Sequence, residues 1–486
     1  MKRITYLLMF CLFAAPSCDL LNRPVYNNIE YSTFYKNEKD INLAVIGSYG
    51  RLATIYAADY VKYAELPGDN SQALGDTGDN AQLDKFIISP VSTVLQSAWR
   101  NHYRCIANVN EVLAAIPNIT FTSEAKQLQL EGEALFIRAL CYFNLVRLFG
   151  DVPYIDKPIS VEASQKLTRT AAQTIYDEII IPDLIKAQAQ LPKKADYAAE
   201  DLGRATWAAA ASLLGKVYLT LHDWKNAETV LGEVIASKEY SLLPVYADVF
   251  DPNNANHAES IFEIQYEKGY TGGSQWSCQA HSQQLATALG ISCSSVTMPT
   301  VDIFNALSED GAGAARKAAS VGEITIAGGA KVKHVKKHYM ELSIQNHSDD
   351  NWPLLRYADV LLMYAEALNE QSAVPTQDAI DCINLIRRRA HAVTADTTHD
   401  LTPADVIDQT TFRQVIAHER RLELCFEGHR WFDLVRTGEY QRVMNAYFEQ
   451  YNSSNYVVED YNNLMPIPQR EIDVNPNLLP NNRGYN

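Results

Sequence analysis

Apolar residues recur every three to four positions through most of the chain, which is the spacing of an amphipathic α-helix. Pro117 and Gly150 mark the ends of two such runs, because neither residue type continues a helix well. The pattern predicts helices over residues 39–57, 94–116, 123–149, 171–190, 206–221, 224–237, 354–370, 376–390 and 411–426. We therefore predict a mainly α fold.

One predicted helix pair has the spacing of a tetratricopeptide repeat. Gly215 and Ala227 are small enough to let two helices approach closely, while Tyr218 and Leu231 fill the seam between them. A second pair, within residues 354–390, places two alanines at the same separation. We expect a tetratricopeptide-like helical-repeat body with long loops and a few short strands.

Two stretches break the helical pattern. Residues 241–351 are rich in Gly, Ser, Asn and Asp and contain a short β-like run at 260–265, and residues 66–80 are also irregular. Long loops on a helical scaffold commonly carry binding residues. We expect a helical frame over about 39–240 and 352–436, with 241–351 as a loop-rich insert that carries the ligand site.

The N-terminus resembles a bacterial lipoprotein signal. Two cations follow Met1, an apolar run covers residues 6–15, and small residues precede Cys18. We predict a signal peptide at 1–17, lipid attachment (palmitate) at Cys18 and a single domain over 18–486. No later segment is apolar for long enough to span a bilayer.

Composition narrows the choice of partners. The net charge of −16 and the pI of about 5.2 argue against nucleic acid, whose binding needs a basic surface. The chain has 27 tyrosines, whose apolar rings and hydroxyl groups suit hydrophilic ligands such as sugars or peptides, although many tyrosines pack between helices.

Neither cysteines nor acidic loops indicate a metal or a cofactor. No CxxC or Cys/His ligand spacing occurs, and a disulfide between Cys278 and Cys293 is an open alternative in an exported protein. The oxygen-rich stretches 76–80 and 251–256 lack the spacing of an EF-hand, which favours turns built on Asn and Asp.

Residues 426–438 read FEGHRWFDLVRTG and place His429 between Glu427 and Asp433. An active site is one interpretation of these groups. We favour a structural one, in which arginines and carboxylates brace helix ends and the aromatic rings fill the core beneath.

Four stretches carry a family resemblance. They read EGEALFIRALCYFNLVRLFGDVP at 131–153, LRYADVLLMYAEALNE at 355–370 and ERRLELCFEGHRWFDLVRTG at 419–438, with MPIP, Glu471 and NPN close to the end of the chain. Together with the Cys18 start, these motifs are similar to those of the SusD/RagB family of outer-membrane nutrient-binding lipoproteins. The resemblance covers nearly the whole chain.

The resemblance implies a lipid-anchored surface protein of the outer membrane that caps a SusC-like TonB-dependent transporter. Such proteins bind oligosaccharides, or in some lineages peptides, without cleaving them. Many relatives have an acidic cluster after the lipidated cysteine, whereas only Asp19 is acidic here. We expect the family motifs to be structural braces, through Arg356, Glu427, Arg430, Trp431 and Asp433.

Ligand contacts are then expected in the irregular loops, where two regions match the family's ligand-bearing positions. The candidate ligand residues are Asp69, Asn70, Asp79, Tyr270, Gln275 and Trp276. Trp276 is the first choice, because an indole among Gly, Ser and Gln has little core to fill.

Three rival functions are weaker. A glycoside hydrolase or peptidase lacks support, since the chain has no HExxH, no GxSxG and no cysteine placed with His and Asn as a nucleophile, so no catalytic residue is predicted. A RagB-like peptide-binding protein is the nearest alternative. A pure protein scaffold would bind no small ligand.

Overall fold

The fold is described from a computed structural model. The described residues are 34–57, 59–75, 77–269, 273–280, 286–287, 290, 296–326, 328–338, 348–393, 395–451 and 455–485. Cys18 and the predicted signal peptide lie outside these ranges.

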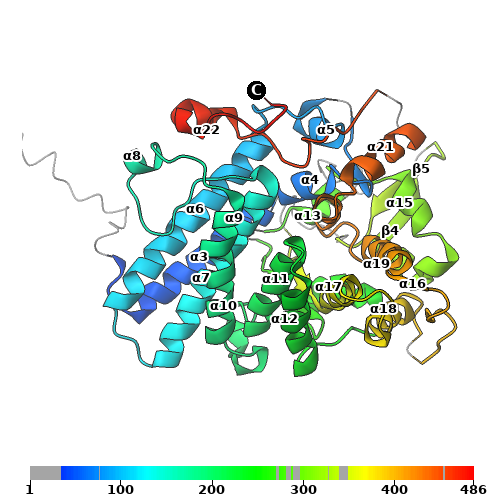
Figure 1. The fold of residues 1–486 in the computed structure, drawn as a ribbon, viewed down its shortest axis with the longest axis horizontal. Helices are drawn as coiled ribbons and strands as arrows, with labels where there is room; N and C mark the ends of the chain where they lie inside the picture. Colours follow the sequence, from blue (N-terminus) through cyan, green and yellow to red (C-terminus); the bar gives the residue numbers. More distant parts are fainter. Residues whose placement is uncertain are drawn as a thin grey trace, which may run out of the picture.

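Long helices follow one another in a continuous row, each packed on the next in chain order (Figure 1). They are α3 Glu38–Tyr56, α6 Thr93–Ala115, α7 Glu124–Phe149, α10 Ile181–Gln190, α11 Trp207–Thr220, α12 Trp224–Ser237, α17 Tyr357–Glu370, α18 Gln377–Ala390 and α19 Gln409–Glu423. Ser, Thr, Asn or Asp side chains cap most of their first turns. The mainly helical architecture predicted from the sequence is confirmed.

The other described α-helices are shorter than most of those in this row. They are α4 Tyr60–Glu65, α5 Gly78–Asp84, α8 Val161–Ser164, α9 Ala172–Ile175, α13 Trp276–Ala280, α15 Val301–Ala306, α16 Ala314–Ser320, α20 Arg430–Arg436, α21 Tyr440–Tyr451 and α22 Gln469–Val474. Most are shorter than two helical turns, too short for their apolar periodicity to stand out in the sequence.

Three two-stranded antiparallel sheets complete the described fold. The pairs are β1 Ser71–Gln72 with β3 Met298–Pro299, β2 Ser260–Ile264 with β6 Trp352–Arg356, and β4 Val321–Thr325 with β5 Lys331–Val335. The β2–β6 pair places residues 260–264 beside residues 352–356, so the chain between these two strands leaves and returns at one place.

Three helix predictions were wrong in part. The helix predicted over 411–426 ends at Glu423, and Phe426 has a positive φ of 66° that a helix does not allow. Residues 354–356 belong to strand β6, because their backbone groups pair with β2 before the helix begins at Tyr357. The run 171–190 is helical but contains a π turn over Tyr176–Ile180. Pro182 follows this turn and has no N–H to donate, and the wider turn accommodates it.

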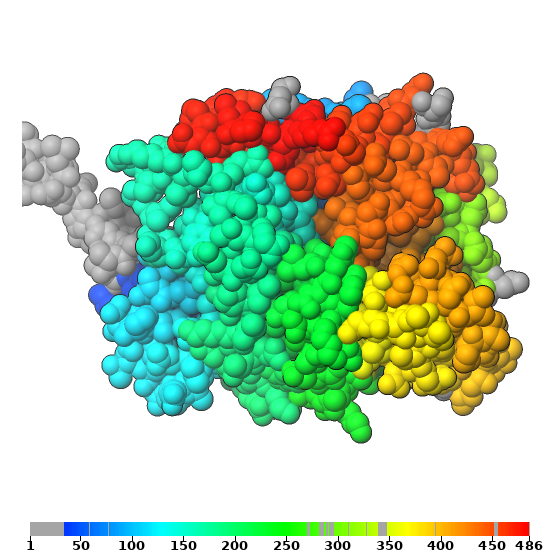
Figure 2. All heavy atoms as spheres, viewed as in Figure 1, coloured from blue at the N-terminus to red at the C-terminus, as the bar shows by residue number. Residues whose placement is uncertain are grey.

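The C-terminal segment is tied across the helical row (Figure 2). The Met465 amide donates to the Leu148 carbonyl, and the Asn482 side-chain amide donates to the Phe149 carbonyl. Arg169 in turn donates to the Pro480 carbonyl. These contacts explain why the Phe-Gly-Asp-Val-Pro turn and the C-terminal motif occur together. Among the described helices, none combines the length and apolarity needed to cross a bilayer.

The α11–α12 seam matches its sequence-based description. Leu231 and Ala227 are fully buried, and a Cβ added to Gly215 would lie 2.5 Å from Leu231 Cδ2. The glycine is therefore required by the close approach of the two helices.

We predict that Gly215→Ala lowers the free energy of unfolding by about 1–3 kcal/mol through overpacking, despite the better helix propensity of Ala. The matched control is Gly47→Ala in α3, where an added Cβ has nothing within 4 Å. It should be neutral or stabilise by up to about 1 kcal/mol. Urea unfolding monitored by circular dichroism measures both, and equal effects of the two changes would contradict the steric argument.

Candidate functional site

The family-like C-terminal segment is organised by one buried guanidinium group. Arg356, at the end of β6, is 1% exposed. Its Nε donates to Glu427 at 2.7 Å, and its Nη1 donates to Glu423 at 2.7 Å and to Glu259 at 2.9 Å. The residue thus connects the β2–β6 pair to the segment that follows α19.

Other buried charges complete this cluster, which we call the central ion cluster. Its cations are Arg316, Lys337, Arg356 and Arg389, and its carboxylates are Glu259, Glu419, Glu423 and Glu427. Burial alone would raise the pKa of Glu427, but the charges of Arg356 and Lys337 outweigh it and lower that pKa to about 2. The cluster is charge-balanced and resembles a structural brace.

A second group of charges surrounds His429. Asp433 accepts hydrogen bonds from Arg420 and Arg436, and His429 Nδ1 lies 3.3 Å from Lys216 Nζ. Burial and then the Lys216 cation lower the pKa of His429 to about 3, so the ring is neutral near pH 7. Because an ammonium group only donates, Nδ1 accepts this hydrogen bond. The arrangement fits the structural interpretation of His429 better than a catalytic one.

Asp69 meets the same segment. Arg430 donates to both of its carboxylate oxygens, at 2.6 and 2.9 Å, and Arg421 Nη2 lies 3.1 Å from Oδ2. Burial opposes ionisation, yet the two arginines hold the pKa of Asp69 well below its usual range. Asp69 is 2% exposed. The sequence predicted that Asp69 contacts a ligand. This prediction is corrected, because the Asp69 carboxylate is already bonded to the guanidinium groups of Arg430 and Arg421.

Asn70 and Asp79 also have internal roles. Asn70 is fully buried, and its side-chain oxygen accepts from Arg421 Nε at 2.9 Å. Asp79 is half-buried. Its carboxylate accepts hydrogen bonds from the backbone N–H and the hydroxyl of Thr93, the first residue of α6. Short polar residues in the 66–80 loop therefore position that loop on its neighbours.

The reason for choosing Trp276 is wrong. Its indole is 2% exposed and stacks on Trp352, with ring centroids 4.0 Å apart. The His338 ring also stacks on Trp352 at 5.0 Å and lies 6.1 Å from Trp276. The ring fills a core that the local sequence does not reveal. Gln275 is half-buried, and Tyr270 lies outside the described residues.

The structure brings the two predicted loop regions together. The amides of Val296 and Thr297 donate to the Gln279 carbonyl at the end of α13, and β3 follows directly and pairs with β1. The Thr300 hydroxyl then donates to the Asp69 carbonyl at 2.7 Å. We call this assembly of β1, β3, α13 and the Trp276–Trp352 stack the loop base.

Hydrogen bonds also fix the other side of the loop base. Ser274 and Ser348 form an isolated antiparallel bridge, and the Tyr266 amide donates to Asn351 at 2.8 Å. Cys278, which lies in α13, is part of a disulfide bond. Cys293, its predicted partner, lies outside the described residues, so the pairing stays a prediction.

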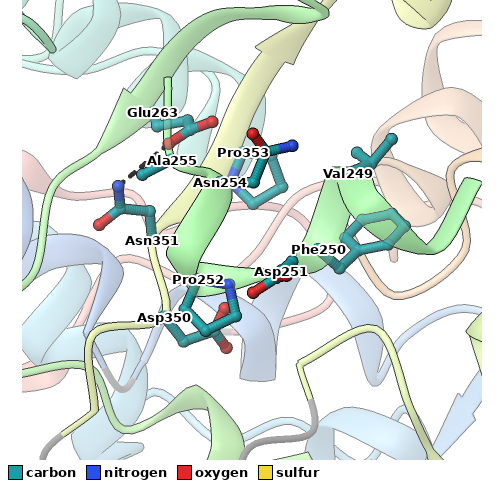
Figure 3. A pocket seen from close by; sticks show the side chains of 10 residues that line it. All are labelled: Val249, Phe250, Asp251, Pro252, Asn254, Ala255, Glu263, Asp350, Asn351 and Pro353. Atoms are coloured by element: carbon teal, nitrogen blue, oxygen red, sulfur yellow. Dashed lines mark hydrogen bonds between the residues drawn. The ribbon is translucent and has the colours of Figure 1, made fainter. Parts of the chain in front are cut away.

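A recess lies beside the loop base, between the segment 249–255 and the end of the insert (Figure 3). Asn351 donates to Glu263 at its edge, at 3.0 Å. The recess has a cavity volume of about 20 Å³, which admits about one water molecule and no sugar ring. Asp251 accepts from the Asn253 amide, an Asx turn, and no metal-binding group of acidic, His or Cys side chains occurs among the described residues.

Sequence reasoning missed Glu65, Arg421 and Trp352. Glu65 is fully buried at the end of α4 and accepts from the Gly428 amide at 2.6 Å. Trp352 precedes a recognised motif, and Arg421 lies inside one. Motif membership could have indicated Arg421, whereas Glu65 and Trp352 gave no signal because their partners lie elsewhere in the chain.

Comparison with known proteins supports the family resemblance at both ends of the chain. The profile described as "SusD family" matches residues 307–485, and the profile described as "Starch-binding associating with outer membrane" matches residues 55–219. The first contains the His429 segment and α17, and the second contains α6, α7 and α11.

Individual relatives match over nearly their full length. The chain is 29% identical to SusD-like protein P25 of Formosa agariphila, over 98% of each protein. It is 25% identical to starch-binding protein SusD of Bacteroides thetaiotaomicron, over 87% of this chain and 84% of that protein. A crystal structure of a SusD homolog from the same species superposes with a TM-score of 0.82 at 24% identity, over 94% of this chain and 99% of the other.

We predict that Trp276→Ala lowers the free energy of unfolding by about 3–5 kcal/mol, because it removes a buried, stacked indole. The control, Gln275→Ala, should change it by less than about 0.5 kcal/mol. Chemical denaturation of both variants measures the difference. An unchanged stability of the Trp276 variant would restore the original interpretation of an exposed ring.

We predict that Glu65→Gln flattens part of the pH dependence of stability. Burial raises the pKa of Glu65 from 4.5 to about 7. The contribution of Glu65 to the free energy of unfolding is therefore complete below pH 4.5 and is lost as the pH rises through 7. This contribution is roughly 3 kcal/mol at most. Glutamine mimics the protonated form at all pH values. Unfolding measured from pH 4.5 to 8 tests this, with exposed Glu449→Gln as control, and a curve parallel to wild type would refute it.

Proposed function

The chain belongs to the SusD family, and from this premise we propose that it is a cell-surface glycan-binding protein that captures oligosaccharides and passes them to a TonB-dependent outer-membrane transporter. The observation that carries the proposal is the likeness over more than four fifths of both chains to a starch-binding relative. Proteins of this family bind without catalysis, and we assign no catalytic residue.

We propose that the glycan binds above the loop base. The Trp276–Trp352 stack, the Ser274–Ser348 bridge and the β1–β3 pair make a rigid support, and rigid support lowers the conformational entropy lost on binding. Of the residues predicted from the sequence, Gln275 and Tyr270 are the ones we retain as ligand contacts, because Asp69, Asn70 and Trp276 are committed to internal contacts.

Membrane attachment through lipidated Cys18 and display on the cell surface complete the proposal. A lipid anchor would keep the binding protein beside its transporter. We propose that a lid-like movement over the transporter then delivers the glycan inward. A single domain built of frame and insert, as predicted from the sequence, is retained here as part of the proposal.

The test is a binding screen of the mature protein against α-glucan and β-glucan oligosaccharides, host and bacterial glycans, and peptides. We expect at least one glycan class to give binding heat and to raise the melting temperature, because a ligand at 100 times its Kd stabilises by about 2.7 kcal/mol. The Gln275→Ala/Tyr270→Ala double variant should weaken binding about tenfold or more, equivalent to about 1.4 kcal/mol.

Gln188→Ala in α10 serves as the matched control and should bind as wild type does. Binding of peptides alone would favour the RagB-like alternative, and binding of neither class would favour a scaffold. Release of reducing ends from a bound glycan would contradict the assignment as a binding protein.

A further inference from the structure

A groove lies on a different part of the molecule from the loop base. The middle of α6, residues 99–111, forms its floor, with the segment 153–167, which includes α8, on one side and α22 on the other. Figure 1 shows these elements next to one another. The C-terminal segment is fixed there, since Asn475 donates to the Leu167 carbonyl. The groove has a volume of about 360 Å³, within the range of specific binding sites.

Unpaired cations concentrate at this groove. Of the arginines within the described ranges, four make neither a hydrogen bond nor an ion pair: Arg51, Arg100, Arg104 and Arg470. Arg100 and Arg104 line the groove, and Arg470 adjoins its wall residue Glu471. Lys157, also in the lining, is unpaired as well. In a chain of net charge −16 this is an unusual accumulation of free positive charge.

The charged residues on the floor of the groove are arranged in order along the axis of α6. Arg100, Arg104, Ala107 and Glu111 follow one face of α6, because residues three or four apart lie above one another on a helix. The face is about 16 Å long, at about 1.5 Å per residue. Its cations lie at one end, the small Ala107 lies in the middle and a carboxylate lies at the other end.

The rim is aliphatic and exposed. Val161 of α8 is 75% exposed, Val474 of α22 is 51% exposed and Ile159 is 38% exposed. These residues approach the groove from both sides. Arginine is enriched at protein interfaces, and the exposed aliphatic side chains beside it offer apolar surface that a partner can bury.

A sugar fits this groove less well. Trp99 is 4% exposed, so its ring offers no free face, and the Tyr103 hydroxyl already donates to the Pro153 carbonyl. Glu111 and Glu471 in the walls would repel an acidic sugar, whereas a peptide can place different charges at different points along the groove.

We propose that this groove docks a linear segment of a partner protein, one that inserts aliphatic side chains over Ala107 and presents carboxylates to Arg100 and Arg104. The site is separate from glycan capture and does not depend on it. Charge complementarity selects the occupant, and the exposed valines provide the apolar contact.

The experiment selects a random linear-peptide library on the wild-type protein and measures enriched peptides by fluorescence anisotropy. We expect the peptides to share aliphatic residues next to Asp or Glu, and to lose affinity tenfold or more when those acids become Asn or Gln. Arg100→Glu/Arg104→Glu should cause the same loss with only a small change in melting temperature, since neither side chain makes a hydrogen bond or an ion pair and only the longer-range attraction between Arg100 and Glu471 is lost.

Arg51→Glu is the matched control, because Arg51 is also exposed and unpaired but lies on α3 outside the groove; it should leave binding unchanged. The proposal is overturned if no peptide is enriched, if enriched peptides lack acids, or if they bind the Arg100/Arg104 variant equally. It is also overturned if that variant instead abolishes glycan binding or self-association of the chain measured by sedimentation.

Discussion

The pairing of buried charges is the constraint on which the rest of this structure depends. An unpaired ion in a protein interior costs several kcal/mol, so four buried cations require four carboxylates close by. The central ion cluster draws these groups from the residue before β2, α16, the turn after β5, β6, α18, α19 and the turn after α19. Because the geometry of each pair restricts the others, the insert is held against the helical frame at a fixed position. Apolar packing alone would allow more freedom of placement.

The helical frame was predictable because its signals are local. Periodicity, capping residues and small-residue spacing act within a few turns, and α12 begins and ends where the sequence predicts. The irregular loops were not predictable in this way. Asp69 is bonded to Arg430, which lies 361 positions later, and the indole of Trp276 is covered by Trp352. A polar or aromatic residue in a glycine-rich loop looks available until its distant partner is known.

The two kinds of surface on this molecule differ in how their charges are used. Around Arg356 and Asp433 nearly every cation is matched by a carboxylate, which suits rigidity and leaves little free charge for recognition. Along the exposed face of α6, arginines have no internal partner. Motifs rich in charged residues are therefore the least suited to contact a ligand here, whereas a plain stretch of helix carries the free charge.

The central ion cluster also imposes an order on biosynthesis. Glu259 and Arg316 are made long before Glu423 and Glu427, which lie near the end of the chain. Until that last part has been synthesised, the cations of the cluster lack three of their four counterions, Glu419, Glu423 and Glu427, and burying them is unfavourable. The insert therefore cannot settle onto its frame while the ribosome is still translating it.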